Sequence, residues 1–394
     1  MNIHFSRISS DFFRTYPKPC RYAEQQKTSL ISTNKIHRSV IQYGKESGVA
    51  ALHKHTQSYR LLEWIAVCGE LPFLNLDLLP VKPDYLSKLL TALKREGWIR
   101  CIYKDKLRSY RLTKKAKMLL LKNDPKRFAF YLTGNVDTNL CRREISRRLR
   151  LQHTAQAKLM QLRAGICLFR DQKAGIFEQT YQGRDNLSFP VYYDSREIRE
   201  MEIGHMIGNS RATGILITSD AVYVVYNTGS GILKWMPAAE KRLKAQLEYL
   251  LQYSGRTHEL KNHEFRGLMF GDTMKEAYRL MESQGGRKDN WFCPDNIFTA
   301  FHFIPLNSCG VKMLKRLCDQ VKRPFHDTWK LGFYHNSLQP LDARDFDMVK
   351  IRQYREWIED YGASGKILCY DFQKPEPGSN WNNGLKWVSE YEKE

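Results

Sequence analysis

The pattern of hydrophobic and polar positions is most regular between residues 57 and 123. Apolar side chains recur there at helical spacing up to Gly69, which predicts a helix that ends at this glycine. Residues 73–79 predict a short second helix. A third helix is predicted from Pro83 to Gly97, because proline is favoured at the first helical position and glycine just after the last. Its apolar stripe consists of four leucines, Leu86, Leu89, Leu90 and Leu93.

A hairpin and a further helix complete this segment. Residues 98–103 and 109–113 have the composition and alternation of strands, and residues 114–122 predict a helix. The polar tip between the two strands carries three cations, Lys104, Lys106 and Arg108. Helix, short helix, helix, hairpin and helix is the order of a winged helix-turn-helix domain, which we therefore expect at residues 57–123.

The third helix of such a domain lies in the major groove of double-stranded DNA, and the wing contacts the neighbouring backbone or minor groove. The side chains of this helix that are expected to face outward are Tyr85, Ser87, Lys88, Thr91, Lys94 and Arg95. Together with the three cations of the wing, they are the predicted DNA contacts. The alternative is a small helical domain with a solvated charged face, or one that binds protein.

The distribution of charge supports a polyanionic partner. The chain of 394 residues has 63 Lys and Arg against 42 Asp and Glu, a net charge of +21. Residues 1–170 contain 33 of the basic and 12 of the acidic side chains, and the remainder contains 30 of each. A field this one-sided attracts nucleic acid. Because the sequence has no apolar run of membrane-spanning length, no signal peptide and no basic amphipathic helix with an aromatic face, we expect a cytoplasmic protein without a membrane partner.

Two basic segments flank the predicted winged helix. Residues 1–56 are polar and poorly periodic, as in a partly disordered arm. Residues 124–170 are expected to form an arginine-rich helical connector, with a long helix over 139–164 whose buried side includes Ile145 and Leu149. Its arginines are Arg142, Arg143, Arg147, Arg148 and Arg150. They either extend the phosphate-binding surface or form the solvated face of a connector, and the sequence favours neither.

The neutral remainder of the chain alternates strands and helices. Predicted strands cover residues 189–193, 212–218, 221–227, 232–235, 267–270, 297–304 and 366–372, and predicted helices cover residues 237–253, 273–283 and 310–320. This alternation predicts an α/β domain at residues 171–374 with a mixed sheet covered by helices. Residues 375–394, rich in Gly, Asn and Glu, are expected to be a flexible tail. The predicted fold class is α+β with several domains.

Residues 155–270 follow the element order of a restriction-endonuclease-like core, with a helix, a meander of strands, a helix and another strand. Active members hold Mg²⁺ with an acid on one strand and an acid-x-Lys on the next. Asp194 and Asp220 are candidates for the first acid, but residues 222–227 carry no charge where the acid-x-Lys is needed. We therefore expect a degenerate, inactive core without catalytic residues. A metal-dependent nuclease that uses Asp194 or Asp220 is the alternative.

Metal-binding motifs are not evident in the sequence. The nine cysteines are scattered without a C-x-x-C pair, and His258 and His263 are five residues apart, which does not place them on one helix face. We expect neither a metal nor another cofactor.

The residues around the third helix and the hairpin resemble a known family. Residues 85–90, 93–99 and 110–113 read YLSKLL, LKREGWI and YRLT, and residues 160–166 read MQLRAGI before the predicted sheet. In these runs the chain resembles the replication-relaxation family, winged-helix proteins of bacterial plasmids and integrative elements. The resemblance implies DNA binding in the replication, relaxation or mobilisation of a mobile element, without catalysis by this chain.

The predicted function is thus sequence-specific or structure-specific binding of double-stranded DNA. We expect the α/β domain to serve homodimerisation or the recruitment of a replication or relaxase partner. A winged-helix transcriptional regulator whose α/β domain senses a ligand is a further alternative.

Overall fold

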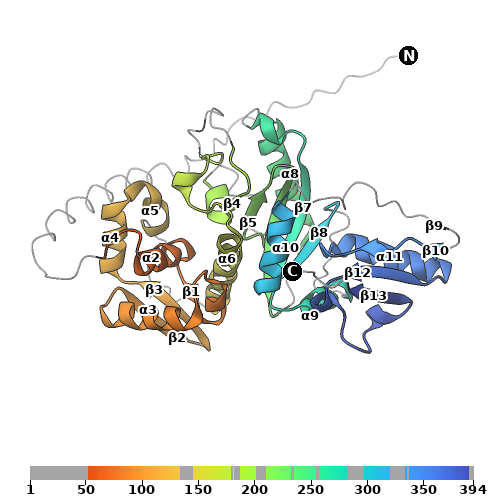
Figure 1. Cartoon of the computed structure of the whole chain (residues 1–394). Coiled ribbons are helices and arrows are strands. Elements are labelled where there is room, and N and C mark those ends of the chain that lie inside the picture. Colours follow the sequence, from red (N-terminus) through yellow and green to blue (C-terminus); the bar gives the residue numbers. More distant parts are fainter. Residues whose placement is uncertain are drawn as a thin grey trace, which may run out of the picture.

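The computed structural model describes residues 52–133, 145–178, 181, 187–200, 210–231, 235–253, 257–282, 297–319, 333–334 and 337–389 (Figure 1). The chain mixes α-helices with several β-sheets, which confirms the predicted mixed class. The expected basic arm lies outside the described residues up to position 51. Within the described part, no helix is both long and apolar enough to cross a bilayer.

The N-terminal unit, residues 57–123, consists of three helices, a 3-10 helix and a small sheet. In chain order its elements are α2 (Gln57–Cys68), β1 (Leu71–Pro72), η2 (Phe73–Leu78), α3 (Pro83–Arg95), β2 (Ile99–Lys104), β3 (Leu107–Leu112) and α4 (Lys114–Asn123). The sheet is antiparallel in the order β1-β3-β2. The helices and the hairpin predicted from the sequence are all present, and the short second helix is a 3-10 helix.

Local chemistry explains where these helices begin and end. The Thr56 side chain accepts a hydrogen bond from the Tyr59 amide and so caps the start of α2, and Gly69 ends it in a positive-φ conformation of 71°. Pro83 is the first residue of α3, whose four leucines are buried. The Thr113 hydroxyl caps α4 by accepting from the Ala116 amide.

The sequence did not predict helix α5 (Pro125–Leu132). Asp124 ends α4 and also caps α5, because its carboxylate accepts a hydrogen bond of 3.0 Å from the Arg127 amide. Asp124 and Pro125 therefore form a turn between two packed helices.

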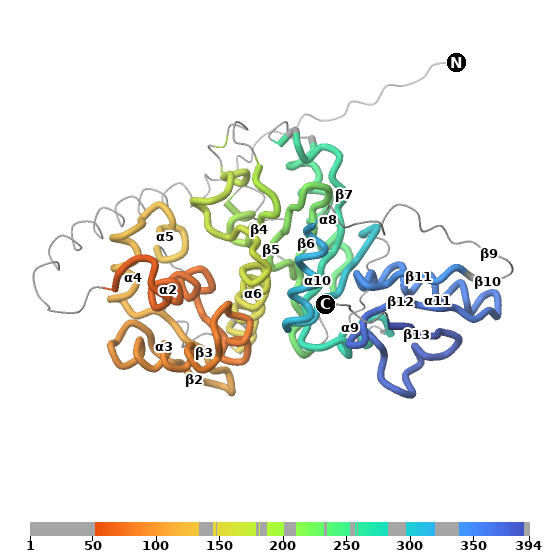
Figure 2. The backbone as a smooth tube through the Cα atoms, in the orientation of Figure 1, coloured from red at the N-terminus to blue at the C-terminus, as the bar shows by residue number. Residues whose placement is uncertain are grey.

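Helix α6 (Ile145–Ala164) lies between the N-terminal unit and a five-stranded sheet (Figure 2). It contacts α2, β1 and η2 on one side and β6 (Ala221–Gly229) and α10 (Ser308–Cys318) on the other. A Cβ at Gly229 would lie 2.7 Å from His153 Nε2, so glycine allows this close approach between β6 and α6. The helix is thus a shared central element.

The buried face of α6 differs from the one predicted. Ile145 and Leu149 were expected to be buried, but they are 48% and 37% exposed. Arg148 is fully buried instead. The reason is that the surface opposite this turn of the helix consists of a carboxylate and hairpin carbonyl groups rather than apolar side chains.

The five-stranded sheet has the order β4-β5-β6-β7-β8. Its further strands are β4 (Val191–Asp194), β5 (Gly214–Ile217), β7 (Glu264–Gly271) and β8 (Phe301–Pro305). The first three strands are antiparallel, and β7 and β8 continue parallel to β6. The remaining helices of this region are α7 (Ser195–Ile198), α8 (Pro237–Glu248) and α9 (Met274–Glu282). The predicted mixed sheet is confirmed, while residues 232–234 of one predicted strand lie outside the described residues.

The C-terminal part of the described chain forms a separate, three-stranded parallel sheet. It consists of β11 (Leu341–Asp342), β12 (Gly365–Cys369) and β13 (Leu385–Ser389), and α11 (Met348–Tyr361) connects the first two strands. The expectation of a flexible tail is wrong for residues 375–389, because β13 pairs with β12 and the Trp381 side chain is 1% exposed. Its ring lies 5.9 Å from that of Tyr278 and 4.5 Å below the Arg355 guanidinium.

Truncation of this tryptophan should therefore destabilise the protein. For Trp381→Ala we expect a loss of about 3–5 kcal/mol in the free energy of unfolding, because a large buried aromatic leaves a cavity. Lys386→Ala, which changes an exposed neighbour on β13, should shift stability by less than about 0.5 kcal/mol. Urea denaturation of both variants measures the difference. Equal stability of the two variants would show that the C-terminal strand does not pack as described.

Candidate nucleic-acid interface

Helix α3 presents one polar face to solvent. The six side chains predicted to face outward are all exposed: Tyr85, Ser87, Lys88, Thr91, Lys94 and Arg95. Lys88, Thr91 and Arg95 follow one another at intervals of three and four residues, so they form one line along the helix. The opposite face is held in the core by the leucine stripe. The structure therefore brings the predicted residues of α3 together on a single surface.

The β2–β3 hairpin turns through two residues, Asp105 and Lys106, which have φ angles of 54° and 62°. Two positive φ angles fit a type I′ turn, which favours Asn-Gly or Asp-Gly. The left-handed conformation costs a non-glycine residue about 1 kcal/mol. Lys106 occupies the position where glycine is preferred. Lys106 at the tip of the hairpin is thus less favourable for stability than glycine would be at the same position.

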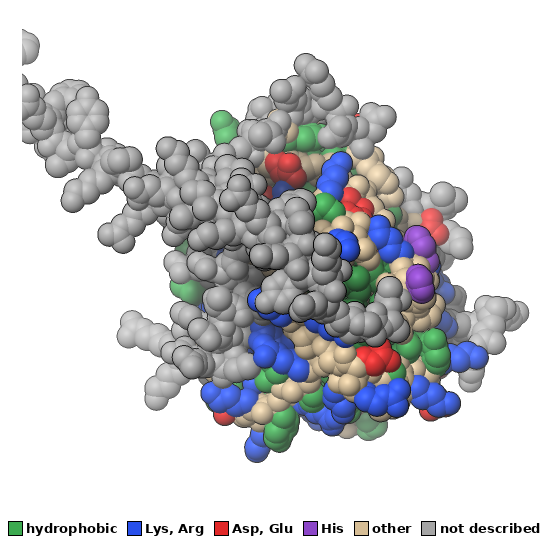
Figure 3. All heavy atoms as spheres, turned by 90° about the vertical axis from the view of Figure 1, so that its left-hand side faces the viewer, with side chains coloured by type: hydrophobic (Ala, Val, Ile, Leu, Met, Phe, Trp, Pro, Cys, Tyr) green, Lys and Arg blue, Asp and Glu red, His purple; other side chains and the backbone are tan. Residues whose placement is uncertain are grey.

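The three predicted wing cations, Lys104, Lys106 and Arg108, are exposed. The Arg108 guanidinium lies 4.0 Å above the ring of Phe73 in η2, a cation–π contact that restrains its direction. Figure 3 shows that Lys and Arg side chains gather over the lower part of this face of the molecule, which α3 and the hairpin occupy, with few acidic side chains among them.

The predicted connector arginines divide into three groups. Arg142 and Arg143 lie outside the described residues, and Arg147 lies in α6 without a described side chain. Arg150 is exposed. Arg148 is buried in an ion pair of 2.9 Å with Glu70, so it does not belong to a phosphate-binding surface.

Sequence reasoning missed a further group of cations at the base of the hairpin, away from its turn. Arg100 of β2 and Arg111 of β3 are direct cross-strand partners, an arrangement that is unfavourable for like charges. Burial, together with Arg111 and Arg100 nearby, lowers the pKa of Lys117 in α4 to about 8. The sequence could have revealed the Arg100–Arg111 pair, because a two-residue turn at 105–106 sets the register that places these residues opposite each other.

The two candidate acids of the sheet do not form a metal site. Asp194 lies beside Gly214 at the start of β5, whereas Asp220 precedes the residues that pair with the end of β5. The length of β5 separates them, about 10 Å at the rise of a strand. Among the described residues, no group of three His, Cys, Asp or Glu side chains is arranged to hold a metal ion.

Asp194 is instead engaged in the structure. Burial opposes its ionisation, but the Lys158 ammonium at 2.6 Å lowers its pKa to about 2. Its other oxygen accepts hydrogen bonds from the amides of Arg196 and Glu197 and so caps α7. Asp220 accepts a hydrogen bond of 2.8 Å from the Thr218 hydroxyl and lies 3.6 Å from Arg266.

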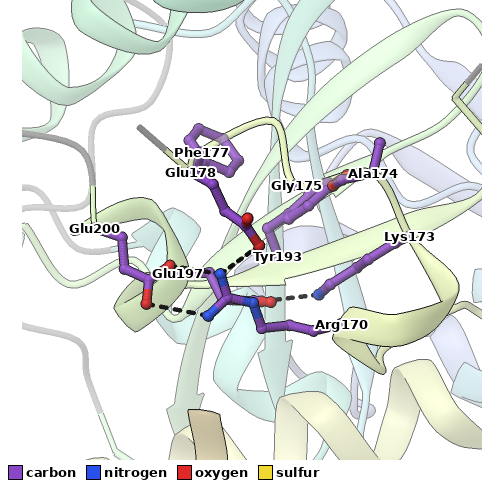
Figure 4. Close-up of a pocket in the computed structure, with 9 residues that line it drawn as sticks. All are labelled: Arg170, Lys173, Ala174, Gly175, Phe177, Glu178, Tyr193, Glu197 and Glu200. Atoms are coloured by element: carbon purple, nitrogen blue, oxygen red, sulfur yellow. Dashed lines mark hydrogen bonds and ion pairs between the residues drawn. The ribbon is translucent and has the colours of Figure 1, made fainter. Parts of the chain in front are cut away.

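A small, partly open pocket lies beside α7 (Figure 4). It contains two cations, each paired with carboxylates. The Arg170 guanidinium is 2.6 Å from Glu178 and 2.8 Å from Glu200, and the Lys173 ammonium is 2.8 Å from Glu197. With three carboxylates around two cations, this pocket does not have the charge of a phosphate site.

Comparison with known proteins identifies no relative: no family model, curated protein or solved structure matches the chain.

The lowered pKa of Lys117 makes stability depend on pH. Its ordinary value is 10.5, so between about pH 8 and 10.5 the unfolded chain binds more protons at this group than the folded chain, and the group's cost to stability falls as the pH rises. Lys117→Met should therefore stabilise the protein at pH 7, and this advantage should shrink at pH 9. Urea denaturation at both values tests this, with Lys122→Met on the same helix as the control. If Lys117→Met stabilised the protein equally at pH 7 and pH 9, the lowered pKa of Lys117 would be contradicted.

Proposed function

We propose that residues 57–123 form a winged helix that binds double-stranded DNA. The order of elements and the sheet order β1-β3-β2, with a hairpin that follows the third helix, support this fold. The observation that carries the functional proposal is the group of exposed Lys and Arg side chains on α3 and the β2–β3 hairpin (Figure 3).

In this proposal α3 enters the major groove. Lys88, Lys94 and Arg95 contact phosphates or base edges, and Tyr85, Ser87 and Thr91 supply shorter polar contacts. The hairpin lies along the adjacent backbone, where Lys104, Lys106 and Arg108 face phosphates. The strained conformation of Lys106 supports this role, because the left-handed position would otherwise be occupied more favourably by glycine.

The five-stranded sheet is proposed to be a degenerate restriction-endonuclease-like core. Helix α6, the antiparallel meander β4-β5-β6, helix α8 and strand β7 parallel to β6 follow that order. Strand β6 carries no acidic side chain, and Asp194 and Asp220 are separated by the length of β5. We therefore propose a non-catalytic role in which the sheet recruits a second copy or a replication or relaxase partner, in the replication or mobilisation of a bacterial mobile element.

Removal of the α3 cations tests DNA binding. The triple variant Lys88→Ala, Lys94→Ala and Arg95→Ala should bind a duplex roughly 100-fold more weakly than the wild type, because three contacts of about 1 kcal/mol each are lost. The measurement is the dissociation constant at fixed, near-physiological salt.

A matched control separates local contacts from net charge. Lys241→Ala, Arg242→Ala and Lys244→Ala remove the same charge from α8 of the sheet. This variant should change the dissociation constant by less than about threefold, since it alters only the long-range field. Equal losses in the two triple variants would mean that α3 is not the binding helix.

A further inference from the structure

Helix α6 has an unusual buried face, because several of its buried side chains are polar: Arg148, Gln152, Gln156, Lys158 and Gln161. Buried polar groups are costly unless they are hydrogen-bonded. The partners of Arg148, Gln152, Gln156 and Lys158 therefore show what the helix holds in place.

Arg148 binds the tip of the hairpin. Its Nη1 donates a hydrogen bond of 3.0 Å to the carbonyl oxygen of Lys104, and its Nη2 donates one of 3.4 Å to that of Leu107. Lys104 and Leu107 are the cross-strand pair that flanks the two-residue turn. One side chain of α6 thus contacts the backbone on both sides of the turn that carries Lys106.

Glu70 completes this contact. Its Oε1 accepts hydrogen bonds from Arg148 Nη2 at 2.9 Å, from the Ser109 hydroxyl at 2.6 Å and from Gln152 Nε2 at 3.2 Å. Burial would raise the pKa of Glu70, but the hydrogen bonds from Ser109 and Arg148 hold it below its usual value. The carboxylate is therefore ionised and fixes the guanidinium against β3.

The same helix is fixed to the five-stranded sheet. Gln156 donates a hydrogen bond of 2.7 Å to Asn75 in η2 and accepts one of 2.9 Å from Asn227 in β6. Lys158 donates to the carbonyl oxygen of Val67 in α2 at 2.9 Å and pairs with Asp194 at the end of β4 at 2.6 Å. The hairpin, η2, α2 and the sheet therefore share one rigid support.

We propose that Arg148 is a positioning residue for DNA binding. It sets the direction of the hairpin relative to α3, and through α6 it fixes the hairpin to the five-stranded sheet. Strand β1 pairs with β3 only at Ser109 and Tyr110, so the part of the hairpin that carries the turn is two-stranded. A two-stranded segment is only marginally stable by itself, and Arg148 supports the turn that presents Lys106 to DNA. The inference rests on the proposed DNA binding, but the position of the hairpin is also measurable without DNA.

Arg148→Lys tests the proposal in the full chain. Lysine keeps the charge beside Glu70 but cannot reach both carbonyl groups with a planar fork. Hydrogen exchange at the amides of Lys104 and Leu107, the cross-strand pair that flanks the turn, should become at least about tenfold faster, as expected for the loss of one or two buried hydrogen bonds. Duplex DNA should bind about tenfold more weakly, by the same argument.

A double-mutant cycle distinguishes positioning from general stability. If Arg148 acts through the hairpin, Arg148→Lys combined with Lys106→Ala should bind DNA little more weakly than Lys106→Ala alone. When Arg148→Lys is combined with Lys88→Ala in α3, the losses of DNA affinity caused by the two substitutions should multiply. Arg127→Lys is the matched control, because Arg127 joins Glu63 and Asp171 by ion pairs of 3.1 and 2.9 Å in a different part of the protein. It should leave hairpin exchange and DNA affinity unchanged.

Three results would overturn the inference: unchanged hairpin exchange in Arg148→Lys, unchanged DNA affinity in Arg148→Lys, or losses that multiply equally with Lys106→Ala and Lys88→Ala. Failure of the proposed function is recognised separately, since the wild type would then bind no duplex while hairpin exchange still responds to Arg148→Lys.

Discussion

The ion pair between Glu70 and Arg148 connects the β2–β3 hairpin to helix α6. Both side chains are 1% exposed, so the pair forms at a high desolvation cost. Hydrogen bonds to Ser109, Gln152 and two hairpin carbonyl groups offset that cost. Loss of one partner from such a pair typically costs about 3–5 kcal/mol, because the remaining charge is left buried. The ion pair therefore couples the stability of the hairpin to that of α6.

This constraint changes the role of α6 from a connector to a central support. One continuous core extends from Tyr59 in α2 through the sheet to Leu385 in β13. Because α6 is packed on both sides, the basic surface on α3 and the hairpin has a fixed orientation relative to the five-stranded sheet. A protein that binds DNA through this surface would present the sheet to partners at a defined angle, which suits assembly at a DNA site.

The sequence predicted the N-terminal unit well because its signals are local. A leucine stripe, Pro83 and Gly97 define α3 without reference to the rest of the chain. The outward side of α3 follows from the same periodicity. The burial of Arg148 could not be predicted this way, since it depends on Glu70, which is 78 residues away in the sequence. Charged side chains on a helix are usually solvated. Arg148 is an exception because its partners, Glu70 and two carbonyl groups of the hairpin, lie outside α6.

The C-terminal segment shows the same limit. Glycine and asparagine around Trp381 are typical of a loose tail, yet strand β13 pairs in parallel with β12 and the Trp381 side chain is buried. Parallel pairing is non-local, so composition alone does not reveal it. Asp194 was recognised as a notable acid, but its capping of α7 and its pairing with Lys158 became evident only with the fold.

The salt dependence of duplex binding by the full chain tests the central claim most directly. A surface with about six phosphate contacts predicts a linear fall of log K with log salt, with a slope near −5. Absence of binding at low salt, or an affinity that does not change with salt, would contradict the proposal that α3 and the hairpin bind DNA.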